Sequence, residues 1–222
     1  MNVIPEKEVI IEAVINGINT AKNNFAEWTG EKLFLSYAPA NFISMHIAQE
    51  INKLENKPEI FINASIADTL KCALPSRNDY KNFMKNNNIN DRLFCINLDD
   101  RFDHETNQDS IARVIMSTKN GVRNVKDEYI NDIEVMAKVL NYKDKKDSSL
   151  DYAIFAFYLD ISNSARIKAK KRIEEIVSSF DEIVSSYKYI NSTFIGGEVN
   201  NIENIGEWSI GLYLIEPKCK SV

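Results

Sequence analysis

Cysteine, histidine, proline and glycine are all scarce in this 222-residue chain, with three, two, five and seven copies respectively. The cysteines (Cys72, Cys95 and Cys219) lie far apart and form no Cys-x-x-Cys pair, so the sequence lacks the spacing of a disulfide framework or a zinc site. Both histidines, His46 and His104, are isolated from other metal-ligating residues. We therefore expect reduced thiols in a cytoplasmic protein. A chain of this length buries roughly 70% of its unfolded surface and needs neither a disulfide nor a metal to fold.

Long apolar runs and an excess of basic residues are also missing. No apolar stretch approaches the ~18 residues of a membrane span, and no cationic segment followed by an apolar core begins the chain. We therefore expect neither a membrane anchor nor a signal peptide. The chain carries 27 basic and 32 acidic residues, a net charge of −5. Because nucleic-acid-binding domains usually show a basic excess or a basic face, binding of DNA or RNA would need a local basic patch.

The chain does contain a regular series of amphipathic and apolar segments. Helical periodicity predicts helices over residues 6–27, 40–54, 125–140 and 164–187. Apolar runs predict strands over residues 59–64, 92–98, 111–118, 152–159 and 208–215. The run at 152–159 is almost continuously apolar, which is typical of a central strand covered on both faces, and places Phe155, Phe157 and Tyr158 in the core. A short helix or turn is expected over 66–72, and polar connections over 75–91, 99–110, 141–149 and 191–206, the last as a loop or an edge hairpin.

The order of these elements predicts the fold class. Three consecutive strands, a helix, a strand, a helix and a strand indicate an α/β protein with a mixed central sheet flanked by helices. The strands at 92–98 and 111–118, which a polar loop joins, are expected to be antiparallel neighbours. Because we find no internal repeat and no boundary, we expect a single domain over residues 1–222. It would consist of an N-terminal helical segment, about 1–38, and a core, about 40–217.

The strand at 111–118 is the segment around which a functional site is most readily built. Its apolar run, Val114 to Met116, leads into Ser117, Thr118 and Lys119, and the turn Asn120-Gly121 follows. A strand that presents a lysine at its end, just before a turn, is one way in which a rigid scaffold positions a catalytic side chain.

Three segments, in this order, resemble the PD-(D/E)XK superfamily, whose fold is called restriction-endonuclease-like. Residues 114–122, VIMSTKNGV, resemble its strand-to-turn signature of apolar residues, glutamate, any residue, lysine and asparagine. Residues 92–98, RLFCINL, resemble the preceding strand, and residues 127–140, DEYINDIEVMAKVL, resemble the helix that follows. The resemblance covers roughly residues 40–215. It implies a helix, a meander of three strands, a crossover helix and a further strand.

The resemblance also implies a metal-dependent nuclease site, and the chain departs from it at the acidic positions. In such a site two or three carboxylates hold Mg²⁺, which activates water, beside a lysine. Lys119 matches the lysine, but Ser117 stands at the glutamate position, Phe94 at the aspartate position and Asn63 near a first-strand glutamate position. Asp91 lies close enough to Phe94 to leave the register open. Because serine and phenylalanine cannot hold a hard divalent cation, we expect no bound metal and no cofactor.

Other acidic residues are available if the chain is an active nuclease. The metal-binding carboxylates would then be Glu50, on the helix at 40–54, and Asp91, with Lys119 as the catalytic lysine. Further candidates for a displaced acid or a general base are Asp79, Asp99, Asp100, Asp103, Glu105, His46 and His104. A surface carboxylate, a solvated loop or a solvated lysine at a strand end is the ordinary alternative for these residues.

A basic segment begins the helix predicted over 164–187. It contains Arg166, Lys168, Lys170, Lys171 and Arg172. Beside the positive end of a helix dipole, these side chains are candidates for contacts with the phosphates of DNA or RNA. A helix face solvated by lysines is the alternative.

The sequence therefore supports three functional hypotheses. The first is a restriction-endonuclease-like protein with a degenerate, inactive metal site that acts by binding a nucleic-acid or protein partner. The second is an active, Mg²⁺-dependent nuclease with relocated carboxylates. The third is a protein–protein interaction subunit of a defence or regulatory complex, which the acidic balance favours. A protein partner could also be a second copy of the chain, and no membrane partner is expected.

Overall fold

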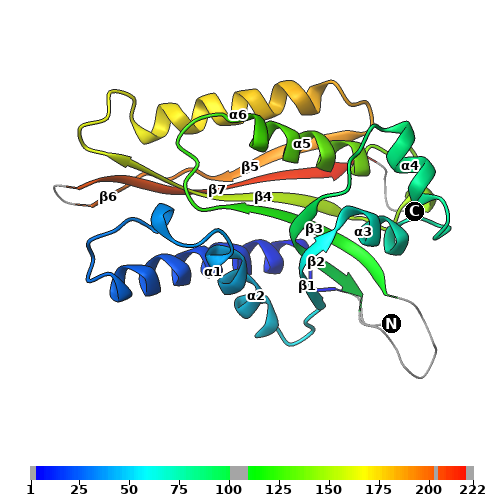
Figure 1. Cartoon of the computed structure of the whole chain (residues 1–222), viewed down its shortest axis with the longest axis horizontal. Coiled ribbons are helices and arrows are strands. Elements are labelled where there is room, and N and C mark those ends of the chain that lie inside the picture. Colours follow the sequence, from blue (N-terminus) through cyan, green and yellow to red (C-terminus); the bar gives the residue numbers. More distant parts are fainter. Residues whose placement is uncertain (1–3, 101–109, 203–204, 219–222) are drawn as a thin grey trace.

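The computed structural model describes residues 4–100, 110–202 and 205–218 and has three layers, a sheet between two layers of helices (Figure 1). The strands are β1 (Glu59–Ser65), β2 (Leu93–Asp100), β3 (Ile111–Lys119), β4 (Tyr152–Ser162), β5 (Ile190–Gly196), β6 (Asn200–Ile202) and β7 (Gly206–Pro217). The helices are α1 (Lys7–Trp28), α2 (Phe42–Asn52), α3 (Ile66–Ala73), α4 (Tyr80–Asn86), α5 (Asp127–Leu140) and α6 (Ala169–Ser185), with short 3₁₀ turns η1 (Leu35–Tyr37) and η2 (Lys145–Asp147). The predicted α/β class, with a mixed sheet flanked by helices, is confirmed.

The sheet has the strand order β1-β2-β3-β4-β7-β5, and β6 pairs with β7. Strands β1, β2 and β3 form an antiparallel meander, so the predicted antiparallel pairing of β2 with β3 is confirmed. Strand β4 runs parallel to β3, and α5 connects the two, as parallel neighbours require a crossover. Because β3 and β4 are parallel, the loops that follow them emerge at the same end of the sheet. This end is where ligands usually bind in open α/β sheets.

Alternation of side chains along the strands fills two cores, one on each face of the sheet. On one face, Ile115, Phe155 and Phe157 pack with residues of α3, α5 and α6. On the other face, Met116 and Tyr158 pack with residues of α1 and α2. Strand β4 is buried almost from end to end, as its continuous apolar sequence predicts.

Helix α1 is an amphipathic helix that lies against α2 on one face of the sheet (Figure 1). Its buried residues recur at helical spacing, which gives it one apolar stripe. Gly17 permits close contact between the two helices, since a Cβ atom at this position would lie 2.5 Å from Cα of Ile47. Within residues 4–100, 110–202 and 205–218, no helix is long and apolar enough to cross a membrane.

Three segments differ from the sequence-based expectation. Helix α6 begins at Ala169 rather than near 164, because the Ser162 hydroxyl accepts a hydrogen bond from the backbone N–H of Ser164 in a turn that delays the helix. The polar connection at 75–91 contains the short helix α4. The connection at 191–206 contains β5 and β6, closer to the hairpin alternative than to a loop. Helix α4 and the strands β5 and β6 are peripheral and incompletely buried, so their sequences show only a weak apolar pattern.

Candidate functional site

Lys119, the last residue of β3, points toward α5. Its ammonium nitrogen lies 3.1 Å from Oδ2 of Asp132 and also forms an ion pair with Glu128. The ring centroid of Tyr129 lies 5.7 Å from the same nitrogen. Glu128 and Asp132 are one helical turn apart on α5, so both face β3. The Lys119 side chain is only 17% exposed, which excludes a freely solvated lysine.

Asp132 is the centre of this network. It is 3% exposed and accepts a hydrogen bond of 2.5 Å from the hydroxyl of Ser117, the residue at the expected glutamate position. Arg92, just before β2, forms a second ion pair with Asp132. Burial lowers the pKa of the Arg92 guanidinium, while the hydrogen bond from Lys119 lowers the pKa of Glu128. A carboxylate therefore does lie beside the lysine, but the helix after β3 supplies it.

The network does not fit a Mg²⁺ site. Two carboxylates, Glu128 and Asp132, meet two cations, Lys119 and Arg92. A divalent cation would have to displace both cations from Asp132 to obtain oxygen ligands there. Across the described ranges, no group of three or more His, Cys, Asp and Glu side chains is placed to hold a metal ion.

Glu50 and Asp91, the carboxylates expected from the sequence, lie apart from this network. Glu50 is on α2, on the opposite face of the sheet, where it accepts a hydrogen bond of 3.3 Å from Thr20 and pairs with Lys53 at 2.6 Å. Asp91 is exposed and accepts a hydrogen bond of 3.2 Å from the backbone N–H of Ala67, at the start of α3. The structure therefore brings neither of them to Lys119.

No carboxylate reaches Lys119 from the other described positions that the sequence suggested. Phe94 is buried in the core against α3 and α5, and Asn63 is an exposed residue of β1 with a positive φ of 59°. Asp79 precedes α4 as its N-terminal flanking residue. His46 is buried, with Nδ1 2.9 Å from the carbonyl oxygen of Phe42 and Nε2 3.0 Å from Nδ2 of Asn24, which is a structural role.

The acids of the 99–110 segment lie at the other end of β2 and β3. Asp99 is buried and accepts a hydrogen bond of 2.7 Å from Ser110, and burial raises its pKa to about 6. Asp100 pairs with Arg113 at 2.7 Å. The candidates Asp103, His104 and Glu105 lie outside the described residues.

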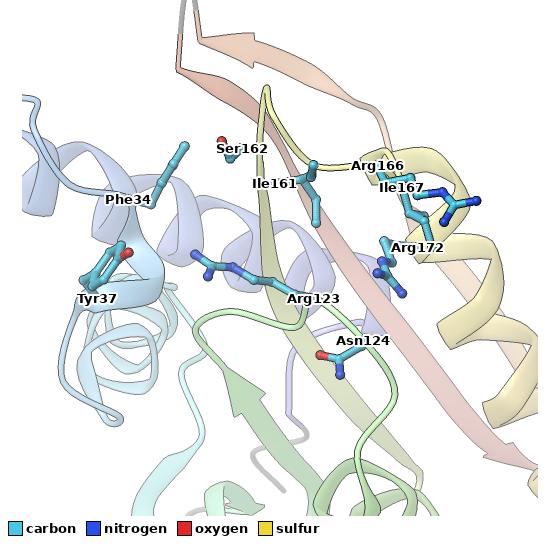
Figure 2. Close-up of a pocket in the computed structure, with 10 residues that line it drawn as sticks. Phe34, Tyr37, Arg123, Asn124, Ile161, Ser162, Arg166, Ile167 and Arg172 are labelled. Carbon is cyan, nitrogen blue, oxygen red and sulfur yellow. The ribbon is translucent and has the colours of Figure 1, made fainter.

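A cavity of about 620 Å³ lies beyond the ends of β3 and β4, and the basic segment forms one side of it (Figure 2). It is lined by Phe34, Tyr37, Arg123, Asn124, Ile161, Ser162, Ala165, Arg166, Ile167 and Arg172. The three arginines come from three segments, namely the β3–α5 connection, the β4–α6 connection and α6. These lining residues include no aspartate or glutamate. We call this site the arginine cavity.

Two of the predicted phosphate-contact residues, Arg166 and Arg172, line the arginine cavity, and the lysines lie beside it. Lys170 and Lys171 are exposed, and Lys168 is exposed while donating a hydrogen bond of 3.0 Å to the carbonyl oxygen of Asn163. The N-terminal end of α6 already has an anionic partner, because the backbone N–H of Ala169 donates a hydrogen bond of 2.8 Å to the Glu207 carboxylate. The contribution expected from the α6 N-terminus is therefore taken by Glu207, and the arginine side chains remain.

Sequence reasoning missed Asp132, Glu128, Arg92, Arg123 and Tyr37. A usable signal existed for the two acids, since they stand one turn apart on the helix that follows the lysine strand. Arg123 stands four residues after Lys119, in the connection that follows β3. No local pattern marks Tyr37, which reaches the cavity only through the tertiary fold.

Comparison of the chain with protein-family models, with curated proteins and with solved structures gave no match.

Proposed function

We propose that this chain is a restriction-endonuclease-like protein that binds nucleic acid without metal-dependent cleavage. The order of elements supports the first part: α2, the antiparallel meander β1-β2-β3, the crossover α5 and the parallel strand β4 follow in the sequence that the resemblance implies. Helices α3 and α4 are inserted between β1 and β2.

The observation that carries the proposal is the charge balance around Lys119. Buried charges repay their loss of hydration only when they are paired in good geometry. Asp132 forms ion pairs with Lys119 and Arg92 and accepts a hydrogen bond from Ser117, so its buried charge is paired. Lys119 has a structural role in this arrangement, and both carboxylates of the cluster already form ion pairs, so a metal would have to compete with Lys119 and Arg92.

The arginine cavity supports the second part. Guanidinium groups bind phosphate oxygens through two parallel hydrogen bonds, which suits arginine to nucleic-acid recognition. Three arginines surround the cavity, and the exposed Lys168, Lys170 and Lys171 extend the positive charge along the start of α6. In a chain with a net charge of −5, this is a local basic patch of the kind that such binding requires.

A nuclease that uses Glu128 and Asp132 in place of strand acids is the second candidate. Its support is that both carboxylates contact the Lys119 ammonium. Activity would require Mg²⁺ or Mn²⁺ to break the ion pair between Asp132 and Arg92, so the two candidates predict opposite results in a cleavage assay.

The test measures cleavage and binding with the same protein. Supercoiled plasmid and single-stranded DNA are incubated with the protein and millimolar Mg²⁺ or Mn²⁺, and gel shifts are recorded over a range of salt concentrations. We expect no cleavage and a shift that weakens as salt rises, since phosphate contacts release counterions. Changing Lys168, Lys170 and Lys171 together to glutamine should weaken the shift and flatten its salt dependence.

The matched control changes Lys85, Lys143 and Lys146 to glutamine. These lysines are exposed, and they lie at the opposite end of the sheet, on α4 and in the segment before β4 (Figure 1). The net charge changes equally, so only the position of the charges differs. Cleavage that disappears in Lys119→Ala would establish the nuclease instead. Absence of any shift at low salt would exclude nucleic-acid binding and favour a protein partner.

A further inference from the structure

The arginine cavity has two chemically different sides. Phe34 and the exposed ring of Tyr37 lie on one side, and Arg166 and Arg172 lie on the other (Figure 2). Ile161, at the end of β4, lies between the two sides. A site for an inorganic anion needs cationic groups only. A combination of an aromatic side and a cationic side fits a ligand that carries both a flat ring and a phosphate.

The cationic side is available to a ligand. Arg166 is exposed, and no hydrogen bond or ion pair joins it to any residue within 4–100, 110–202 and 205–218. Arg172 pairs with Glu175 through Nη1 at 3.2 Å, while its buried Nε has no hydrogen-bond partner among the same residues. An unpaired buried donor is costly, so the protein itself satisfies Arg172 only in part.

Arg123 has a different role, because the protein already holds it in place. Its Nε donates to Oδ1 of Asp160 at 2.9 Å, and its Nη2 donates to the hydroxyl of Ser36 at 2.9 Å. Burial alone would lower the pKa of Arg123, but the hydrogen bond and the charge of the fully buried Asp160, together with Tyr37, outweigh burial and raise the pKa. Arg123 therefore forms a fixed floor between the two sides, with its charge largely balanced.

The aromatic side is rigidly mounted. Leu35 of η1 is buried, while Tyr37, two residues on, is 64% exposed. The side-chain amide of Asn120 donates to the carbonyl oxygens of Ala38 and Pro39, at 3.1 and 2.7 Å, and ties η1 to the turn after β3. Gly121, in the turn after β3, packs against η1, since a Cβ atom at Gly121 would lie 2.7 Å from Cβ of Ser36. An exposed ring on a fixed backbone is a low-entropy stacking surface.

We propose that the arginine cavity receives one nucleotide of a single-stranded nucleic acid, with its base against Tyr37 and its phosphate between Arg166 and Arg172. This inference rests on the proposed nucleic-acid binding and names its substrate class. The cavity volume of about 620 Å³ is within the usual range for small-ligand sites. A base can leave its neighbours and stack on an aromatic side chain in a single strand but not in an intact duplex.

The surroundings favour a strand over a free mononucleotide. Lys168, Lys170 and Lys171 are exposed at the start of α6, outside the residues that line the cavity. A mononucleotide would leave these lysines unused. The phosphates that flank a bound nucleotide of a strand would meet them.

The test compares ligands by fluorescence anisotropy. The probes are a fluorescein-labelled oligothymidylate, a labelled duplex of equal length and unlabelled thymidine monophosphate as competitor. We expect the single strand to bind at least about ten-fold more tightly than the duplex, and Tyr37→Ala to weaken single-strand binding by about ten-fold or more, since one stacked base is lost. Tyr37→Phe should retain the affinity, because the ring is kept. Arg172→Gln should weaken binding and reduce the salt dependence by about one phosphate contact.

Two controls distinguish lost stacking from lost structure. Phe61→Ala removes an exposed aromatic side chain from the edge strand β1, outside the cavity, and should leave binding unchanged. Because Tyr37 is mostly exposed, Tyr37→Ala should also leave the thermal midpoint unchanged.

The outcomes separate this inference from the proposed function. Equal binding of single strand and duplex, with no effect of Tyr37→Ala, would overturn the nucleotide site while the lysine variant still supports nucleic-acid binding. If thymidine monophosphate competes as strongly as the unlabelled oligonucleotide, a nucleic-acid strand is excluded as the preferred ligand, and the cavity is a mononucleotide site instead. If no probe binds at low salt, the proposed function itself fails, and this inference fails with it.

Discussion

The Lys119 network and the arginine cavity lie at the same end of the sheet but differ in the acidic residues that face their cations. Around Lys119, two cations meet two carboxylates, and the central carboxylate is 3% exposed. Around the cavity, three arginines meet no acidic lining residue. Lys119 and Arg123 are only four residues apart in the chain. Both have a counter-charge from the fold, since Lys119 pairs with Asp132 and Arg123 pairs with Asp160, whereas Arg166 has no such partner among the described residues. The comparison indicates that a cation at this end of the sheet is structural where the fold supplies its counter-charge and is left for a ligand where it does not.

Burial explains why the two regions can differ so strongly over such a short distance. A buried charge without a partner is expensive, so Asp132 requires both Lys119 and Arg92. An exposed guanidinium such as Arg166 is hydrated and costs little until a ligand arrives. The network should therefore respond to mutation mainly through stability, and the cavity mainly through affinity.

The largest expected effect follows from removing the charge at the centre of the network. Asp132→Asn keeps the size of the side chain but leaves Arg92 without its ion pair and Lys119 with Glu128 alone. Breaking one partner of a buried ion pair costs about 3–5 kcal/mol of unfolding free energy. Chemical denaturation followed by the fluorescence of the two tryptophans measures this loss. A loss below about 1 kcal/mol would mean that the network is not structural.

A second variant shows whether the loss comes from unpaired charges. Replacing the buried set together, as Arg92→Leu, Lys119→Met and Asp132→Leu, removes all three charges while keeping comparable volume. Such replacements are often neutral or stabilising. The triple variant should therefore regain most of the stability that Asp132→Asn loses. If it is less stable than the single variant, then packing rather than unpaired charge explains the result.

Asp99 gives a contrasting case, a buried carboxylate that pairs with no cation among the described residues. It is 4% exposed, and burial first, then the charges of Glu59 and Asp100, raise its pKa from 3.8 to about 6 against the hydrogen bond from Ser110. An acid whose folded-state pKa is raised binds its proton more tightly when folded. The stability of the protein should therefore fall as pH rises from about 4 to about 6 and stay level above that window.

Asp99→Asn should remove this penalty. A shift from 3.8 to about 6 corresponds to about 3 kcal/mol as an upper value, so the variant should be more stable than the wild type by up to that amount at neutral pH. The difference should disappear below about pH 3, where Asp99 is protonated in both states. Unfolding curves at several pH values measure it. A variant that is less stable than the wild type at neutral pH would show that the Asp99 carboxylate is favourable where it lies.

The fold could largely be predicted from the sequence where burial is complete. The apolar run of β4 and the helical periodicity of α1 and α5 are strong because these elements contribute to a core. Strand β5 and helix α4 were harder to recognise, since β5 alternates exposed polar residues at the edge of the sheet and α4 has no buried residue. Incomplete burial leaves little periodicity to detect.

The candidate site was only partly predictable, because its contacts are set by tertiary structure. Lys119 was identified from its own strand, and the absence of carboxylates at Ser117 and Phe94 was read directly from the sequence. Asp132 reaches Lys119 through the crossover of α5, for which the spacing of the two acids on that helix is the only local signal. Arg92 reaches Asp132 through the pairing of β2 with β3, which no local pattern specifies. Tyr37 reaches the cavity in the same way, through the packing of η1 on the turn after β3.

The smallest expected effect concerns Glu128, the exposed member of the Lys119 network. Its side chain is 60% exposed, and Lys119 keeps Asp132 when Glu128 is lost. Glu128→Gln should therefore lower the unfolding free energy by no more than about 1 kcal/mol, and less at high salt. The hydrogen bond from Lys119 lowers the pKa of Glu128 below 4.5, so its contribution is present above that pH and is lost in acid. The unfolding free energies of the wild type and the variant should therefore become equal at acidic pH. A loss as large as that of Asp132→Asn would show that the exposed carboxylate, rather than the buried one, holds Lys119 in place.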